Sequence, residues 1–206
     1  MPDPWLSIPL SDYEGHMNAD SVRQMDALSE LFGRALAYCR PESAAILGVA
    51  GGNGLERIDR SITKRIVGVD INPSYLDAVR QRHSDLPGLE LHCADLASES
   101  VNLPPLQLVH AAVVFEHAGL GRCLDAALSL VAPRGHLSVV LQMPGNAEQN
   151  VSETPYASIQ ALRRHFTPID PARFCETLEN RGFHLAIEAT YPLQSGKVFW
   201  TGIFAR

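Results

Sequence analysis

The chain has 206 residues, of which 46% are hydrophobic and 19% charged, the composition of a single globular domain with a sizeable core. Its net charge of −6 argues against a nucleic-acid partner, because dedicated nucleic-acid-binding proteins present a basic face. The chain has no signal-sequence pattern at its start and no hydrophobic run of the roughly 20 residues that span a bilayer, so we expect a cytoplasmic protein without a membrane partner. Its four cysteines form no CxxC pair, so we predict neither a zinc site nor disulfides.

The N-terminal fifth of the chain predicts an arm followed by a helix. Three prolines and a glycine interrupt the first 20 residues, so we expect a turn-rich arm without a long helix. Hydrophobic residues then recur at helical spacing over residues 19–39, and Pro41 ends this pattern. This helix is expected to cover one face of a sheet.

Residues 46–58 predict a buried strand, a glycine loop and the start of a helix. Gly51, Gly52 and Gly54 allow the backbone to turn sharply and to approach a ligand closely. Leu55 and Ile58 restart helical spacing. The loop alone is a weak signal, because a tight strand-to-helix connection without a ligand has the same composition.

An acidic residue follows each of the next two predicted strands. Asp70 ends the strand predicted at residues 65–69, where its carboxylate can accept two hydrogen bonds from a ribose diol. The alternative is that Asp70 only caps the helix that starts near Pro73. Asp95 follows the alternating strand at residues 89–93 and can accept from an adenine amino group, with Leu96 packing on the ring.

This ordered set, a glycine loop and two acids at three successive strand ends, resembles class I S-adenosylmethionine-dependent methyltransferases over residues 44–142. The resemblance implies that S-adenosylmethionine is the cofactor, with its methionine end at the loop, its ribose at Asp70 and its adenine at Asp95. The implied fold is an α/β, doubly wound, mostly parallel sheet of seven strands with a terminal antiparallel strand. The expected cofactor-binding residues are Tyr13, Met17, Ala50, Gly51, Gly52, Gly54, Asp70, Ile71, Asp95, Leu96 and Phe115.

Two residues depart from the family pattern. Gly48 stands where the family usually has an acid that helps to hold the amino group of the cofactor, and Ala50 stands where it has a glycine. We expect Ala50 to keep an ordinary backbone conformation, because its methyl group disfavours positive φ. Both departures favour the alternative function, a non-catalytic S-adenosylmethionine- or nucleoside-binding domain of methyltransferase ancestry. A dinucleotide oxidoreductase is disfavoured, because the loop A-G-G-N-G is not G-x-G-x-x-G.

The rest of the chain continues the alternation of strands and helices. Residues 107–115 read as a buried fourth strand, residues 124–131 as a helix and residues 136–142 as a fifth strand after a turn at 133–135. The terminal segments 183–191 and 197–205 read as an antiparallel pair. We therefore divide one domain, residues 1–206, into an arm and helix (1–40), a cofactor-binding core (44–142), a substrate-side insert (143–167) and a C-terminal helix and hairpin (168–206).

Glu116 and His117 are the candidate catalytic residues, because they follow the fourth strand. An imidazole titrates near neutral pH, so His117 suits proton removal from an acceptor, and Glu116 can orient an amine or a hydroxyl. The structural alternative is that Glu116 caps the next helix and His117 packs beneath the loop.

The acceptor is narrowed to a small molecule by exclusion. The sequence at 115–118 lacks the motif of amino-directed DNA methyltransferases and the glutamate pair of arginine methyltransferases, and no set of metal ligands converges. The resemblance also makes Tyr13, His16 and Met17 candidate lid residues, with plain packing of the arm as an equal alternative. We expect the arm and residues 143–166, which carry Tyr156 and His165, to roof the cofactor together.

Overall fold

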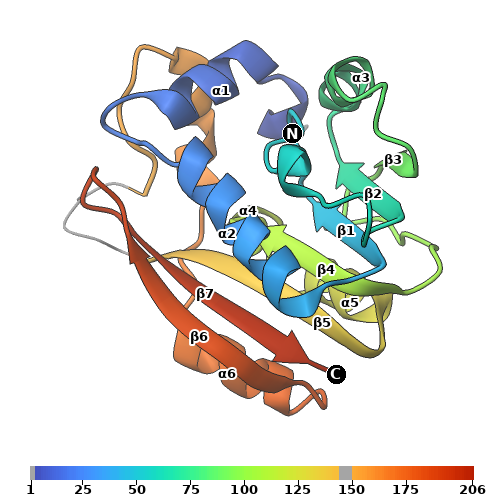
Figure 1. The fold of residues 1–206 in the computed structure, drawn as a ribbon. Coiled ribbons are helices and arrows are strands. Elements are labelled where there is room, and N and C mark those ends of the chain that lie inside the picture. The colour runs from blue at the N-terminus through green and yellow to red at the C-terminus, as the bar shows by residue number, and fades with distance from the viewer. Residues whose placement is uncertain (1–2, 144–149) are drawn as a thin grey trace.

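The structure, a computed structural model, describes residues 3–143 and 150–206. Within these residues the chain forms one seven-stranded sheet in the order β3-β2-β1-β4-β5-β7-β6 (Figure 1). The paired strands from β3 to β5 are parallel, and β7 runs antiparallel to both β5 and β6. This confirms the predicted fold. The strands are β1 (Ser43–Leu47), β2 (Arg65–Asp70), β3 (Leu89–Cys93), β4 (Leu106–Ala112), β5 (Val131–Met143), β6 (His184–Pro192) and β7 (Val198–Ala205).

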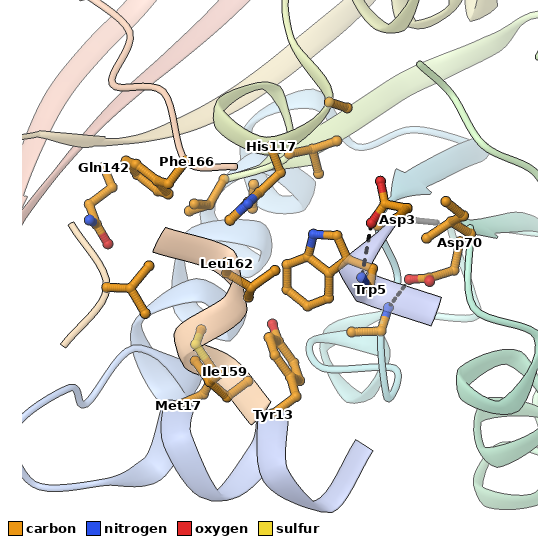
Figure 2. A pocket seen from close by; sticks show the side chains of 18 of the residues that line it. Asp3, Trp5, Tyr13, Met17, Asp70, His117, Gln142, Ile159, Leu162 and Phe166 are labelled. Carbon is orange, nitrogen blue, oxygen red and sulfur yellow. Dashed lines mark hydrogen bonds between the residues drawn. The ribbon is translucent and has the colours of Figure 1, made fainter. Parts of the chain in front are cut away.

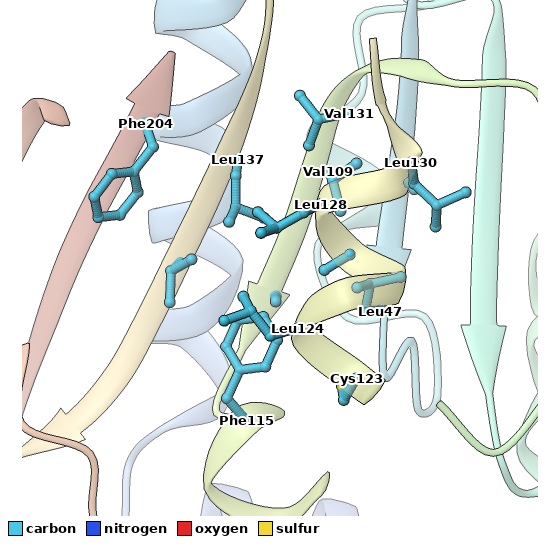
Figure 3. Packing of buried hydrophobic residues seen from close by; sticks show 14 of the residues in the cluster. Leu47, Val109, Phe115, Cys123, Leu124, Leu128, Leu130, Val131, Leu137 and Phe204 are labelled. Carbon is cyan, nitrogen blue, oxygen red and sulfur yellow. The ribbon is translucent and has the colours of Figure 1, made fainter. Parts of the chain in front are cut away.

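Helices cover both faces of this sheet, because its strands alternate hydrophobic side chains between two cores. On one face, Phe32 of α2 (Met25–Cys39) and Leu76 of α3 (Pro73–Arg82) pack with Ile46 of β1. On the other face, Leu124 of α5 (Arg122–Leu130) packs against strand residues such as Leu137 (Figure 3). The helix α6 (Pro171–Glu179) joins this second core. Burial on both faces explains the continuous hydrophobic runs of the central parallel strands.

The N-terminal arm contains a helix that the sequence analysis did not expect. After a 3₁₀ turn, η1 (Pro4–Leu6), the chain forms α1 (Leu10–Asn18). The helix predicted at residues 19–39 begins only at Met25, because residues 19–24 form a turn in which Arg23 has a φ of 49°. The backbone N–H groups of Val22 and Arg23 both donate to the carbonyl of Ala19, which closes this turn.

The helix expected after the glycine loop is a single 3₁₀ turn, η2 (Leu55–Arg57). Residues 58–64 then return to β2 through a turn in which the Asp59 carboxylate accepts from the Ser61 N–H group. This short connection leaves no room for an α-helix, and the preceding helix α2 covers the sheet there instead. The hydrophobic periodicity at Leu55 and Ile58 reflects their burial in the core shared with α2.

Three other boundaries differ from the sequence prediction. The strand β4 ends at Ala112, before a bend at Val113, which has a φ of 56°, and Phe115 opens the short helix α4 (Phe115–Ala118). The strand β5 begins at Val131, and its pairing with β4 shifts register across the expected turn at 133–135. The sequence of residues 158–166 predicts a short amphipathic helix, and the structure has the 3₁₀ helix η3 (Ala157–Arg164) there. Residues 144–149 of that insert lie outside the described residues.

Candidate functional site

A cavity of about 160 Å³ lies at the carboxyl ends of the parallel strands. This is the edge where open α/β sheets bind their ligands. The predicted residues that line it are Tyr13, Met17, Ala50, Asp70, Ile71, Asp95, Leu96 and His117. Five further predicted residues are not among its lining, namely Gly51, Gly52, Gly54, Phe115 and Glu116.

Asp70 lies at the end of β2 with its side chain facing the cavity (Figure 2). One carboxylate oxygen accepts from the Ala50 N–H group at 2.8 Å and the other from the Asn72 N–H group at 2.9 Å. The Ile71 backbone also interacts with this carboxylate, and because the two oxygens have about four acceptor positions, at least one position remains for a ligand. The helix α3 is capped by Asn72, not by Asp70, since the Asn72 side chain accepts from the Ser74 N–H group. Burial raises the pKa of Asp70.

Asp95 lies after β3 and is more accessible than Asp70. Its carboxylate accepts from the Ala97 N–H group at 2.9 Å and from the Ser98 hydroxyl at 2.6 Å. Leu96 is buried beside it, and both residues line the cavity with Ile71. An acid and a hydrophobic side chain therefore stand together at this strand end.

Both departures from the family pattern lie in the turn after β1. Gly48 has a φ of 67°, and a Cβ atom there would lie 2.9 Å from Cγ2 of Val114, so an acidic side chain does not fit. Ala50 has a φ of 46°, so the expectation of an ordinary backbone was wrong. The Ala50 N–H bond to Asp70 accompanies this left-handed conformation.

The three glycines of the loop face protein side chains. A Cβ atom on Gly51 would meet the ion pair of Glu14 and Arg82, and one on Gly54 would meet the Phe32 ring at 3.0 Å. A Cβ atom on Gly52 would similarly lie 2.7 Å from Nε2 of His83. These glycines therefore permit close packing of the loop beneath α1 and α2, while Gly48 and Ala50 line the cavity.

Phe115 is fully buried in the core (Figure 3). Its ring centroid lies 5.6 Å from that of Phe174. The bend at Val113 ends the strand before Phe115 and brings Val113 and Val114 to the cavity in its place. The sequence missed this bend, because a hydrophobic run through residues 107–115 gives no sign of a residue with positive φ.

The structure separates the two candidate catalytic residues. Glu116 is 1% exposed and accepts from the Gln142 N–H group at 2.7 Å, and burial raises its pKa to about 7. It neither lines the cavity nor caps a helix through this carboxylate bond. His117 lines the cavity, and its Nδ1 atom has no hydrogen-bond partner among the described residues. Burial, with a smaller effect of His165, lowers the pKa of His117 to about 4.

The arm and the insert lie against each other beside the cavity. Ser158 donates to the Asp12 carboxylate at 2.6 Å, and Nδ1 of His16 lies 2.9 Å from the Thr154 hydroxyl. Figure 2 shows Tyr13 and Met17 of α1 next to Ile159 of η3. Leu162 and Phe166 extend the same wall. Both segments therefore lie where the sequence analysis expected a roof.

Trp5 is the cavity residue that sequence reasoning overlooked. Its indole lies between Tyr13 and His117, with ring centroids 5.7 Å and 5.1 Å away (Figure 2). The Trp5 carbonyl accepts from the Asn72 side chain at 2.8 Å. The Asp3 carboxylate caps the 3₁₀ turn by accepting from the Trp5 N–H group at 2.9 Å. The proline after Asp3 was a signal for this short helical turn, because proline favours the first helical position.

Polar residues line the opposite end of the cavity, and of these the sequence analysis named only His16. Lys197, Gln142, Gln24, His16 and Asn150 all line it there, and we call this group the polar end. Lys197 carried no sequence motif, because it was read only as the first residue of a terminal strand, whereas β7 begins at Val198. Its burial depends on the pairing of β7 with β5.

The residues around the other end fit S-adenosylmethionine. Asp70 offers an acceptor position for a diol, and Asp95 with Leu96 offers an acceptor beside a hydrophobic surface. The turn at Gly48 and Ala50 brings the backbone to the cavity wall without bulky side chains. The acids that line the cavity within the described residues are Asp3, Asp70 and Asp95.

The chain has the fold of class I S-adenosylmethionine-dependent methyltransferases. It is similar to the N-methyltransferase NodS from Bradyrhizobium japonicum WM9 in complex with S-adenosyl-L-homocysteine, with a TM-score of 0.67 and 15% identity over 89% of this chain and 87% of NodS. The magnesium protoporphyrin IX methyltransferase ChlM from Synechocystis PCC 6803 with bound SAM gives a TM-score of 0.61 and 12% identity over 89% and 78% of the two chains. The DhpI-SAM-HEP complex gives a TM-score of 0.64 and 15% identity over 96% of this chain and 92% of DhpI. By sequence, no protein-family model and no curated protein matches.

The described part of the chain shows neither a membrane-spanning helix nor a group of metal ligands. None of its helices is both long enough and hydrophobic enough to cross a membrane. No group of three or more histidine, cysteine or acidic side chains within residues 3–143 and 150–206 is arranged to hold a metal ion. The described cysteines are all free thiols.

Proposed function

We propose that this protein transfers a methyl group from S-adenosylmethionine to a small-molecule acceptor in the cytoplasm. The observation that carries the proposal is that Asp70, Asp95 and the Gly48 turn, which end three neighbouring strands, all line one cavity. Similar folds have been solved with S-adenosylmethionine or its demethylated product, which supports the same cofactor here.

Each cofactor contact in this proposal has a defined donor or acceptor. Asp70 accepts hydrogen bonds from the ribose hydroxyls, and Asp95 accepts from the adenine amino group while Leu96 and Ile71 pack on the base. The backbone around Gly48 and Ala50 holds the methionine end. S-adenosylmethionine, when bound, supplies an electrophilic methyl group on a sulfonium centre.

We assign the acceptor-side role to His117 and a positioning role to Glu116. Because burial lowers the pKa of His117 to about 4, its imidazole is neutral at pH 7 and can take a proton at Nδ1. Glu116 acts through its bond to the Gln142 N–H group, which fixes the end of β5. Direct displacement depends mainly on alignment of the acceptor, so the base contributes less than the cavity walls do.

The second candidate function is a non-catalytic binding domain for S-adenosylmethionine or a related nucleoside. The specific observation that favours it is that Gly48 occupies the position of the family acid and that its surroundings leave no room for an acidic side chain. Such a domain would use the same Asp70 and Asp95 contacts but would transfer no methyl group.

Calorimetric titration with S-adenosylhomocysteine and with NAD tests the proposal at the level of binding. We expect micromolar binding of S-adenosylhomocysteine and none of NAD; the reverse result would contradict the proposed cofactor. Trp5 gives a second readout, because its indole lies in the cavity while Trp200 is buried among Phe174 and Phe204. Binding should change the fluorescence of the wild type but not that of Trp5→Phe.

Incubation with S-(trideuteromethyl)-labelled cofactor and a panel of small acids, amines and alcohols tests catalysis. Mass spectrometry should find an acceptor that is heavier by one labelled methyl group. Binding without transfer to any member of a broad panel, including a cell metabolite extract, would favour the non-catalytic domain.

A further inference from the structure

The polar end of the cavity contains a buried lysine without an acidic partner. Lys197 is 3% exposed, and it makes no ion pair with any residue in the described ranges 3–143 and 150–206. Its ammonium group donates to neutral oxygens, the Asn150 carbonyl at 3.0 Å and Oε1 of Gln142 at 3.5 Å. A buried charge costs several kcal/mol unless a counter-charge offsets it, so this ammonium group favours an anion.

The neighbours of Lys197 are fixed in an arrangement rich in hydrogen-bond donors. Nε2 of Gln142 donates to the Asn150 carbonyl at 2.7 Å, and Oε1 of Gln142 accepts from Nε2 of Gln24 at 2.7 Å. The bonds of the described residues account for two of the three N–H groups of Lys197 and one of the two of the Gln24 amide. The remaining N–H groups are available to an acceptor in the cavity.

The polar end is distant from the proposed cofactor contacts. Lys197 precedes β7, which lies three strands from β1 and four from β2, or roughly 14 and 19 Å at ordinary strand spacing. Figure 2 shows Gln142 and Asp70 on opposite sides of the Trp5 indole. The methionine end of the cofactor belongs at the Gly48 turn, so Lys197 is placed for a different ligand.

We propose that the polar end binds an oxyanion of the methyl acceptor, a carboxylate or a phosphate, with Lys197 as its charged contact and Gln24 as a neutral donor. That the bound acid is the methyl acceptor rests on the proposed function, whereas the anion site itself does not. Between the polar end and His117 the cavity wall is hydrophobic, formed by residues such as Val151, Leu162 and Phe166. The acceptor is therefore a small acid with a short hydrophobic body, and its anionic group sets its orientation.

Titration of the intact protein with acetate and with inorganic phosphate, against chloride at equal ionic strength, tests this site. The wild type should bind at least one of the two, and the tighter one identifies the class of oxyanion. Lys197→Met should weaken that binding at least about tenfold, since it removes the charged contact. The matched control is Lys64→Met, because Lys64 is the other lysine of the chain and is exposed. It should leave oxyanion binding unchanged.

Titration with S-adenosylhomocysteine separates this proposal from the proposed function. Unchanged binding in Lys197→Met supports the anion site, whereas lost binding with retained binding of methylthioadenosine, which lacks the carboxylate, would mean that Lys197 holds the cofactor. If the wild type binds S-adenosylhomocysteine but neither oxyanion, the anion site is wrong and the proposed function stands. If it binds an oxyanion but not S-adenosylhomocysteine, the proposed function fails and the anion site stands.

Two further measurements keep the proposal testable if Lys197→Met does not fold. Acetate affinity of the wild type should fall between about pH 6.5 and about pH 9.5 as Lys197 loses its proton. Burial lowers the pKa of Lys197 to about 8, and that of the facing His16 to about 4, outside this range. Burial raises the pKa of Glu116, which accepts from the Gln142 N–H group, to about 7, so the profile is also measured in Glu116→Gln, where the fall in affinity should persist. A flat profile would overturn the proposal. So would acetate binding that appears only in Glu148→Gln, because Glu148, which lies outside the described residues, would then supply the counter-charge.

Discussion

Ala50 has a left-handed backbone at a position where glycine is the residue without strain. Its φ of 46° costs an L-residue about 1 to 2 kcal/mol. Ala50→Gly should therefore raise the free energy of unfolding by roughly 0.5 to 1 kcal/mol, after the greater flexibility of glycine in the unfolded chain is subtracted. Urea denaturation measures this, and Ala172→Gly in α6 is the control that should lower stability. A loss of stability in Ala50→Gly would contradict the strain.

Asp70 joins the two loops that we assign to the cofactor. Asp70→Asn should weaken S-adenosylhomocysteine binding by roughly 1.5 to 3 kcal/mol, because a neutral amide replaces a charged acceptor of the ribose hydroxyls. The change is nearly isosteric, but the amide nitrogen cannot accept, so the variant also loses the bond from the Ala50 or the Asn72 N–H group. Urea denaturation therefore checks separately that the variant stays folded. Calorimetry should show no change for Asp85→Asn, which alters an exposed acid on another loop. Equal dissociation constants for both variants would remove Asp70 from the site.

At the scale of elements, the decisive contact is that of α1 with the insert. Gly15 of α1 lies against the Tyr156 ring, and a Cβ atom there would overlap the phenol group. Together with the bonds from Ser158 and Thr154, this contact holds the two segments that border the cavity. The segments were long and weakly patterned in the sequence, and only their tertiary contact shows that they meet.

Alanine substitutions at two mid-helix glycines distinguish the effect of this contact on stability from the effect of helix propensity. Gly33→Ala in α2 should stabilise the protein by up to about 1 kcal/mol, since its Cβ would meet Arg57 only at an ordinary 3.5 Å. Gly15→Ala should gain less or lose stability, because Tyr156 must move away. Hydrogen exchange in residues 10–18 and 150–166 should rise in Gly15→Ala and stay constant in Gly33→Ala. Equal behaviour of the two variants would contradict a packed roof.

Ligand binding should also act on these elements together. We expect S-adenosylhomocysteine to increase the protection of α1 and of residues 150–166 against hydrogen exchange, because both border the same cavity. The buried strand β1 should serve as an internal reference, since its protection reports global unfolding. Unchanged exchange in both segments would place the acceptor site elsewhere.

For the whole molecule, buried histidines predict acid sensitivity. Burial lowers the pKa of His16, His110 and His117 to about 4, below the value of roughly 6.5 in an unfolded chain. The unfolded state therefore binds more protons between these values, and stability is lost as pH falls from about 6.5 to about 4. Glu116 opposes this, because its pKa of about 7 in the folded state makes the protein more stable as pH falls from about 7 to about 4.5.

Burial also raises the pKa of Asp70, which acts in the same direction as Glu116. Three histidines outweigh these two acids, so the free energy of unfolding should be lower at pH 5 than at pH 7. Urea denaturation at both pH values measures the difference. His110→Gln should reduce the pH dependence of the free energy of unfolding by up to about one bound proton. The reason is that His110 is buried against Phe32 and forms a hydrogen bond with Ser138. An unchanged pH dependence in this variant would contradict the lowered pKa of His110.

The sequence by itself indicated the strands and the two acids that follow β2 and β3, and the family resemblance implied the doubly wound sheet. These features depend on local patterns, a hydrophobic run followed by a turn residue and an acid, and local patterns survive without knowledge of the partners. Asp70 and Asp95 were found in this way, and both line the cavity.

Only the tertiary structure decided the backbone at Ala50 and Val113, the burial of Phe115 and Glu116, and the positions of Trp5 and Lys197. A positive φ at a residue other than glycine is imposed by surrounding contacts, such as the bond from the Ala50 N–H group to Asp70, and leaves no trace in composition. Lys197 reaches the cavity because β7 inserts antiparallel between β5 and β6. Such long-range pairing joins residues that are far apart in the chain, so no local pattern records it.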